Sequence, residues 1–489
     1  MLYLFVMHCK YCLLLFPLVL GSCGHFLEEV SQDEIKPSTV EDLRSVMYKE
    51  AYPYQFASDS YLMLLTDEIQ CNGSLNEMYA TKHENGTPVF TFNPMMFDGG
   101  EAFPDDVNSW KVYYEKIMGC NVIIDYIPEV SGTEQEKNAL LGQAILLRGF
   151  YYLKLAMIYC QAYNAEGVDP KTALGVPLIL TMDLTDDYPE RSSLETLYGQ
   201  VEEDLLTATS LLEENYEPDN VYRVGNIAAY VLLSRFYLFR GSDEDLDKAI
   251  QYAQMAIEQG PMLTRLSMLV GTDKSIYDSD ASSEVVWCYG GKSFYNSSSP
   301  YFFTQSYQEI VPWDVSSQLL GAYGTNDLRD DVYFSTDFVR GTYGSKIGYN
   351  SSYGGDHGIR MAEAYLNRAE ALTRRFMTKG DENDRVQALN DLNTLRETRY
   401  VAGTYVDEEI TNAQDLLDFC VNERRLELCM EEGFRWFDIK RFGLSVTHRY
   451  IDSEGTEREY VLESNSLLYA LPIPYDAMER NYKLKQNPR

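Results

Sequence analysis

The sequence predicts a mainly α-helical protein, built as a solenoid of stacked helix pairs with long irregular loops and a few short strands. Three observations predict this class. Apolar residues recur at intervals of three and four along several long stretches. Short polar turns join these stretches, and small residues lie on their apolar stripes. A single helix pair of this kind cannot bury its apolar side, so we expect the pairs to stack into one right-handed solenoid.

The N-terminal residues combine one basic residue, an apolar run and a cysteine. Tyr11–Leu20 is largely apolar, follows Lys10 and is too short for a membrane span, which needs about 20 residues. The sequence Leu20-Gly-Ser-Cys23 resembles a bacterial lipobox, at which the leader is cleaved and the cysteine receives a lipid. We therefore expect residues 1–22 to be a lipoprotein signal peptide and Cys23 to be lipidated.

The region after the leader is predicted to be helical apart from one irregular stretch. Thr39 is a capping residue followed by acidic residues, which indicates the start of a helix. Residues 67–108 are rich in Gly, Pro, Asn and aromatic residues without periodicity, so we expect irregular surface structure there. Helical spacing resumes over Trp110–Ile127 and Glu134–Gln161.

The next stretches form a further helix pair and its neighbour. Ser192–Glu213 and Asn226–Arg240 have helical spacing, and Gly241–Pro261 looks like the second half of a tetratricopeptide unit. Small residues recur along it at the spacing that close stacking requires, at Ala249, Ala253 and Ala256. The predicted solenoid is therefore tetratricopeptide-like.

Residues 262–358 interrupt the helical pattern. Glu284–Tyr289 is typical of a short strand, and a tract rich in Gly, Ser, Tyr and Asn follows it. Long irregular segments inside a compact protein are usually functional, so we expect ligand contacts in this region.

Three more helices are predicted between residues 358 and 432. The first, Gly358–Phe376, has an apolar stripe for a partner helix. The far side of this helix holds polar residues, namely Glu363, Asn367, Glu370 and Arg374. A Gly-Asp turn leads to the second helix, Arg385–Arg399, and the third is predicted near Ala413–Glu432.

Arg424 projects through the middle of the apolar stripe of the third helix. A buried guanidinium without a partner is very costly, so this side chain must meet a carboxylate. Acidic candidates lie close in sequence, at Glu423, Glu427, Glu431 and Asp438. Arg424 either binds a ligand or belongs to a structural ion-pair network. We favour the network, because such networks are common without any chemistry.

Four sequence blocks in the C-terminal part occur in the same order as in a known protein family. They are Arg360–Leu372, Ala388–Arg396, Glu423–Leu428 with Glu432–Gly443, and Leu471–Pro474 with Gln486–Pro488. These blocks resemble the C-terminal region of the SusD/RagB family of Bacteroidetes outer-membrane nutrient-binding lipoproteins. Leu147–Tyr152 and Gly175–Pro177 also resemble this family.

The resemblance implies a mainly helical, tetratricopeptide-like (SusD-like) fold. It implies an N-terminal region over 23–265 with helix pairs, and a C-terminal region over 266–489 with ligand-binding loops. It also implies a surface-exposed lipoprotein of the cell outer membrane, which captures nutrients beside a TonB-dependent, SusC-like transporter.

Charge and composition exclude some classes of function. The chain has 41 Lys and Arg against 75 Asp and Glu, a net charge of −34. Such a surface repels phosphate backbones, so we expect no nucleic-acid partner. The content of 45% hydrophobic and 13% aromatic residues argues against disorder. Six cysteines after Cys23 are scattered without metal-ligand spacing, and we expect most of them to be small buried hydrophobic residues. One or two disulfide bridges among them stay open.

Enzyme and metal signatures in the sequence are incomplete. His83-Glu84 begins a zinc-protease motif, but Thr87 stands where the second histidine is needed. Residues 273–284 have the length of a calcium-binding loop, but Tyr277 occupies a ligand position. We therefore expect no enzyme, no catalytic residue, no metal ligand and no cofactor. A structural Ca²⁺ among the many acids and a hydrolase with a carboxylate pair stay open.

Aromatic residues in the irregular segments indicate a ligand-binding site. Sugars present flat C–H faces, and tyrosine and tryptophan rings offer matching platforms with a polar edge. We predict a ligand-binding set in the two irregular segments, consisting of Trp313, Tyr295, Tyr301, Tyr307, Asn72 and Tyr79. The other three tryptophans, Trp110, Trp287 and Trp436, are expected in the core.

The leading hypothesis is a surface lipoprotein that binds an oligosaccharide or polysaccharide and delivers it to a SusC-like transporter. Two rivals change only what is bound. The same fold could bind peptides, as in RagB-like members of the family, or it could be a helical scaffold that binds only protein.

Overall fold

The structure is a computed structural model, and it describes residues 36–53, 58–73, 79–98, 107–183, 187–272, 274–290, 311–337, 341–344 and 357–489. The chain divides into two units, Met1–Pro37 and Ser38–Arg489. The fold given below is that of the second unit. The leader over 1–22 and Cys23 lie outside the described residues.

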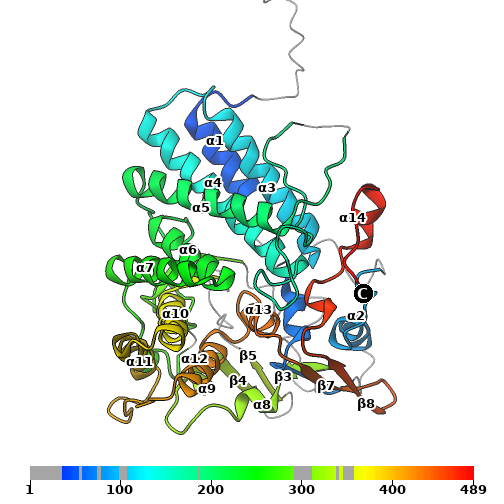
Figure 1. The fold of residues 1–489 in the computed structure, drawn as a ribbon, viewed down its shortest axis with the longest axis vertical. Coiled ribbons are helices and arrows are strands. Elements are labelled where there is room, and N and C mark those ends of the chain that lie inside the picture. Colours follow the sequence, from blue (N-terminus) through cyan, green and yellow to red (C-terminus); the bar gives the residue numbers. More distant parts are fainter. Residues whose placement is uncertain are drawn as a thin grey trace, which may run out of the picture. The chain divides into compact units, whose positions relative to one another are not determined.

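The second unit is mainly helical, which confirms the predicted class (Figure 1). Its longer helices are α3 (Ser109–Tyr126), α4 (Glu134–Tyr159), α5 (Leu194–Asn215), α6 (Asn226–Arg240), α7 (Asp243–Gln259), α10 (Met361–Lys379), α11 (Glu382–Glu397) and α12 (Ala413–Leu428). Shorter helices are α1 (Val40–Val46), α2 (Ala80–Phe90), α8 (Ser317–Leu320), α9 (Arg329–Tyr333), α13 (Phe434–Arg441) and α14 (Tyr475–Arg480). No described helix combines the length and the apolar character that crossing a membrane would require.

Local sequence explains where several helices begin and end. Capping boxes start α1, α4 and α7, and their N-cap residues are Thr39, Thr133 and Ser242. Gly241 and Gly380 end α6 and α10 in the left-handed conformation, which glycine adopts without steric cost.

Helices that follow one another pack together, as the pairing pattern predicts. α4 packs on α3 and α5, α6 packs on α7, and α10 packs on α7, α11 and α12 (Figure 1). Two glycines let α4 approach α5 closely. A Cβ atom at Gly142 would lie 3.0 Å from Leu212 Cγ, and one at Gly149 would lie 3.1 Å from Asp204 Cβ.

The described strands form four small antiparallel pairs. They are β1 (Ile69–Cys71) with β3 (Trp313–Val315), β2 (Val285–Tyr289) with β6 (His357–Arg360), β4 (Phe334–Asp337) with β5 (Gly341–Gly344), and β7 (Val446–Ile451) with β8 (Glu457–Leu462). The strand predicted at Glu284–Tyr289 is therefore confirmed. Helix α2 falls inside a stretch predicted to be irregular, so that prediction was wrong at this point.

One side of α10 differs from the prediction. Its apolar stripe is buried, but Glu363, Asn367 and Glu370 on the far side are also at most 1% exposed. The cause is the position of α10 within the stack, where α6 and α7 as well as α11 and α12 pack against it. The helix therefore has no fully solvated side along these residues.

Candidate functional site

The residues predicted to bind ligand lie partly on the β1–β3 pair. Cys71 on β1 is paired with Trp313 on β3, and Asn72 directly follows β1. The Asn72 side chain is half-buried, and its Nδ2 donates a hydrogen bond to the carbonyl of Val311 (3.1 Å). Tyr79 directly precedes α2, the helix against which Trp313 packs. The fold therefore brings Asn72, Tyr79 and Trp313 into one region.

Trp313 was expected to be an exposed loop aromatic, and this expectation is not met. The residue is in a strand and only 3% exposed. Its ring stacks on His83 (centroids 5.4 Å apart) and packs on Phe90, and Nε1 donates to the carbonyl of Lys82 (2.9 Å). Gly86 makes room for it, since a Cβ atom there would lie 2.5 Å from the indole.

An indole covered in this way offers no face to a sugar. Tyr79 is completely buried as well, so in this structure neither ring is a platform. Tyr295, Tyr301 and Tyr307 lie outside the described residues, between β2 and β3, and their role stays a prediction. The core positions expected for Trp110, Trp287 and Trp436 are confirmed, because these residues are at most 7% exposed.

His83 is the polar member of the same cluster. It lies between Trp313 and Tyr450, whose ring centroid is 5.3 Å away, and its Nε2 is 2.9 Å from the carbonyl oxygen of Ile451. Burial lowers the pKa of His83 below its ordinary value, and burial raises the pKa of the neighbouring Cys71 thiol. This thiol therefore stays protonated at neutral pH and does not act as an activated nucleophile.

The six cysteines after Cys23 have a structural role. All six are buried, as the sequence predicted for most of them: Cys71, Cys120, Cys160, Cys288, Cys420 and Cys429. Within the described ranges, no three His, Cys, Asp or Glu side chains are grouped so that they could hold a metal ion.

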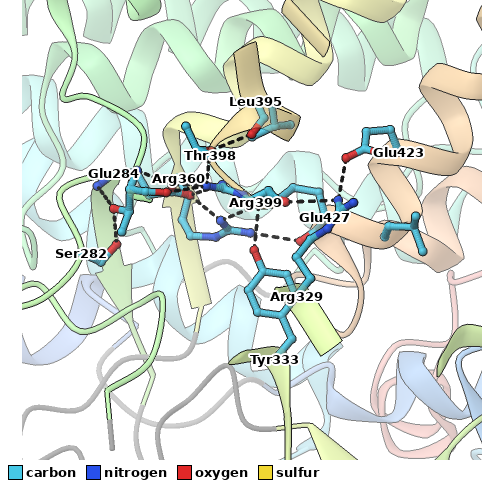
Figure 2. Close-up of polar contacts among 12 residues, drawn as sticks. Ser282, Glu284, Arg329, Tyr333, Arg360, Leu395, Thr398, Arg399, Glu423 and Glu427 are labelled. Carbon is cyan, nitrogen blue, oxygen red and sulfur yellow. Dashed lines mark hydrogen bonds and ion pairs between the residues drawn. The ribbon is translucent and has the colours of Figure 1, made fainter. Parts of the chain in front are cut away.

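A network of buried charges joins the β2–β6 pair to the end of α11 and to α12 (Figure 2). Its centre is formed by Glu284, next to β2, Arg360 on β6, Arg399 after α11 and Glu427 on α12. Arg360 Nη1 lies 2.5 Å from Glu284 Oε1 and 3.0 Å from Glu427 Oε1. Arg399 Nη2 lies 3.0 Å from Glu284 Oε2 and 2.8 Å from Glu427 Oε1. The network therefore joins four elements that are distant in sequence.

Each charge in the centre of this network is engaged by a partner. Burial alone would raise the pKa of Glu427, but the guanidinium groups of Arg399 and Arg360 hold it well below its ordinary value. Tyr333 Oη also donates to Glu427 Oε1 (3.0 Å), and Arg329 Nη1 binds Glu423 at 2.6 Å. Because its charges are paired and at most 1% exposed, this cluster supports the fold and presents no open acid or base.

Arg424 is also part of a structural network, the interpretation that we favoured. Its Nη1 donates to Asn367 Oδ1 (2.7 Å), and its Nε lies 3.6 Å from Asp438. Asp438 was one of the four carboxylates predicted from sequence. The other three bind different arginines, with Glu423 on Arg329, Glu427 on Arg399 and Glu431 on Arg360.

One small pocket lies between α4, α5, α6 and α13. It is lined by Met157, Ala162, Tyr163, Tyr198, Phe239, Phe437, Lys440 and Arg441. Its volume of about 20 Å³ has room for about one water molecule, so it does not admit a sugar ring. Lys440 Nζ donates to the carbonyl of Met157 near the end of α4 (2.7 Å), and burial lowers the pKa of this amine to about 7.

Two protein-family models match this chain. A family model described as "Starch-binding associating with outer membrane" matches residues 28–238, and the SusD family model matches residues 325–489. Between them, the two models match more than half of the chain.

Individual relatives agree with these models. A SusD-like protein of Formosa agariphila is 36% identical over 90 residues, which are 18% of this chain and 17% of that protein. The starch-binding protein SusD of Bacteroides thetaiotaomicron is 32% identical over 130 residues, which are 26% of this chain and 20% of that protein. The aligned parts thus span no more than a fifth of either relative.

The fold extends the likeness to nearly the whole chain. A SusD superfamily protein of Bacteroides vulgatus has a crystal structure that aligns with a TM-score of 0.71 at 21% identity. The alignment covers 92% of this chain and 99% of that one. The sequence blocks, the matching family models and the helical architecture lead to the same conclusion: this chain belongs to the SusD/RagB family.

Proposed function

We propose that this protein is a lipid-anchored receptor at the cell surface, which binds an oligosaccharide or polysaccharide and delivers it to a SusC-like TonB-dependent transporter. The observation that carries the proposal is membership of a family whose matching model is described by starch binding and association with the outer membrane. The partly aligned relative from Bacteroides thetaiotaomicron is itself named a starch-binding protein.

The residues on both sides of the predicted binding segment belong to the packed core. The segment 291–310, which holds Tyr295, Tyr301 and Tyr307, is connected to β2 on one side and to β3 on the other. The residue before β2, Glu284, belongs to the buried charge network, and Trp313 of β3 is packed into the core. The described residues on both sides of this segment are therefore anchored in the core.

The proposed receptor binds its glycan without cleaving it. The buried acidic residues of the charge network bind arginines, and His83 is enclosed between two rings, so these groups are not offered to a substrate. The lipobox supports cleavage after residue 22 and anchoring through a lipid on Cys23.

The test uses the mature chain, residues 23–489, titrated with glycans in a calorimeter. We expect one class of glycan to bind with no change in its length during incubation. The triple variant Tyr295→Ala/Tyr301→Ala/Tyr307→Ala is expected to weaken binding by about tenfold or more, since it removes three stacking rings. Val406→Ala, at a side chain that is 79% exposed, serves as a control with unchanged affinity.

Several outcomes would contradict the proposal. Binding of peptides from a protein digest without any glycan binding would favour the peptide-binding alternative. Shortening of the bound glycan by the purified protein would indicate a hydrolase. In cells, Cys23→Ala is expected to move the protein out of the outer-membrane fraction, and an unchanged distribution would overturn the lipid anchor.

A further inference from the structure

Few aromatic side chains are largely exposed on the described surface, and two of them are in contact. Among the described residues, the aromatic side chains that are largely exposed are three tyrosines, namely Tyr188 (45%), Tyr475 (54%) and Tyr482 (78%). They come from two segments, 187–191 and 475–489, that are far apart in sequence. We call the pair Tyr188 and Tyr482 the tyrosine platform.

Polar contacts join the two segments that carry the platform. Asn481 Nδ2 donates to the carbonyl of Pro189 (2.9 Å), and Lys483 forms an ion pair with Asp187. Arg191 Nη1 donates to the carbonyl of Lys485 (2.9 Å) and to Asn487 Oδ1 (2.8 Å). The positions of Tyr188 and Tyr482 are therefore fixed from both sides before any ligand binds.

The two rings meet at nearly a right angle. The centroids of Tyr188 and Tyr482 are 5.7 Å apart, and their planes are inclined by 78°. In this edge-to-face arrangement, each ring supports the other, and exposed ring surface remains available on both sides of a corner. Such a corner can receive the flat C–H face of one sugar ring and the edge of the next.

The surroundings of the corner favour a carbohydrate over a protein partner. Asp187, whose side chain is 81% exposed, and Lys483 provide hydrogen-bonding groups beside the rings. Exposed rings within a polar rim therefore match an extended, hydroxylated ligand better than a folded partner.

The platform is connected to the region around Trp313 through a short segment. The backbone N–H of Tyr475 donates to the carbonyl of Phe97 (3.4 Å), and Arg489 forms an ion pair with Asp98 (2.8 Å). Phe97 and Asp98 follow α2, which packs against Trp313, and α14 lies on the side of α2 in Figure 1. Described contacts therefore link the segment that carries Tyr482 to the region around Trp313.

We propose that Tyr188 and Tyr482 form a second carbohydrate-contact surface, which stacks against sugar units of a long chain outside the predicted loop site. This proposal rests on the proposed carbohydrate-binding function. A second contact on the same chain raises the overall affinity for polymers through effective concentration, while short oligosaccharides that fill one site gain little.

The experiment compares polymers with short oligosaccharides. The full mature chain is run by affinity electrophoresis in gels that contain soluble starch, xylan, arabinogalactan or mannan, and the hexasaccharide of the retained polymer is titrated by calorimetry. Tyr188→Ala/Tyr482→Ala is expected to weaken retention by the polymer about tenfold and to leave hexasaccharide affinity within about twofold. Tyr188→Phe/Tyr482→Phe keeps both rings and is expected to retain most of the polymer binding.

Each result distinguishes this proposal from the proposed function. Unchanged polymer retention by Tyr188→Ala/Tyr482→Ala, with loss of retention in the Tyr295/Tyr301/Tyr307 triple variant, would overturn the platform and leave the receptor function standing. Equal losses for polymer and hexasaccharide would assign the two tyrosines to the primary site and also overturn it. No binding of the wild-type chain to any of the four polymers would count against both proposals. Both tyrosines are exposed, so an unchanged circular dichroism melting curve is expected to confirm that the variants fold.

Discussion

The two halves of the helical stack differ in how many buried charges they contain. Between α4 and α5, glycines at 142 and 149 allow close approach of the helices, and the buried surface is mostly apolar apart from the ion pair of Arg148 with Asp204. Around α10 and α12, several buried glutamates and arginines lie among the apolar side chains. Apolar contact is tolerant of geometry, whereas ion pairs in a low dielectric require each partner to be in place. The comparison teaches that the C-terminal half depends more strongly on a few individual residues.

The largest expected effect is the removal of a charge from the centre of the network. Glu427→Ala leaves Arg360 and Arg399 buried without part of their counter-charge, and we expect the free energy of unfolding to fall by about 3–5 kcal/mol. Urea denaturation followed by circular dichroism measures this change. Glu397→Ala, at a side chain that is 59% exposed, is the matched control and is expected to change stability by less than about 0.5 kcal/mol. Similar effects of the two variants would remove the distinction between the halves.

Glu68, which contacts Met430 near the end of α12, forms no direct ion pair with any arginine that the structure describes. Glu68 Oε2 accepts a hydrogen bond from the backbone N–H of Met430 (2.9 Å), while Oε1 has no hydrogen-bond partner among the described residues. The neighbouring Arg435 binds Asp67 at 2.7 Å, and Arg425 also pairs with Asp67. Burial raises the pKa of Glu68 to about 7.

The sign of its pH dependence follows from that shift. The pKa of Glu68 is higher in the folded state than its ordinary value of 4.5, so its stabilising contribution is present below pH 4.5 and is lost as the pH rises to about 7. Relative to Glu68→Gln, which does not titrate, the wild type should lose on the order of 3 kcal/mol between pH 4.5 and pH 8. Urea midpoints of both proteins across this range test it. Parallel curves would show that folding does not change the pKa of Glu68.

The apolar half is expected to respond less to a single change. Gly149→Val places side-chain atoms where a Cβ already lies 3.1 Å from Asp204 Cβ, and overpacking of this kind costs about 1–3 kcal/mol. Gly199→Ala on α5 is the control, because no atom lies within 4 Å of its added Cβ, and it should stabilise the helix by up to about 1 kcal/mol. Thermal denaturation of both variants compares them. A stabilising effect of Gly149→Val would show that the α4–α5 contact is loosely packed.

Most of the helices could be predicted because their signals are local. Apolar periodicity and capping residues such as Thr39 and Ser242 lie within each helix or next to it. α2 was missed because Gly86 and Pro88 interrupt its sequence and its apolar residues show no helical period. The period of α10 identified which residues share a side, but it could not reveal that a second layer of helices covers Glu363 and Glu370.

The candidate site was harder to predict because it depends on contacts between distant residues. Trp313 resembles a loop aromatic in the sequence, but it is buried because β3 pairs with β1, far away in the chain, and because α2 packs over it. The partners of Arg360 are likewise distant, as in its ion pair with Glu284. Tyr188 and Tyr482 were not singled out, because only the folded chain brings them together. A weak signal did exist, since each tyrosine has a charged residue within two positions on either side.

The buried cysteines can serve as probes of local unfolding. Burial raises the pKa of Cys71, Cys120, Cys160 and Cys420, so these thiols are poor targets for alkylating reagents while the chain is folded. Each becomes reactive only when its surroundings open. Pulsed alkylation followed by mass spectrometry would therefore measure the rate at which each region opens. Cys120 and Cys160 would probe one half of the stack, and Cys420 would probe the other.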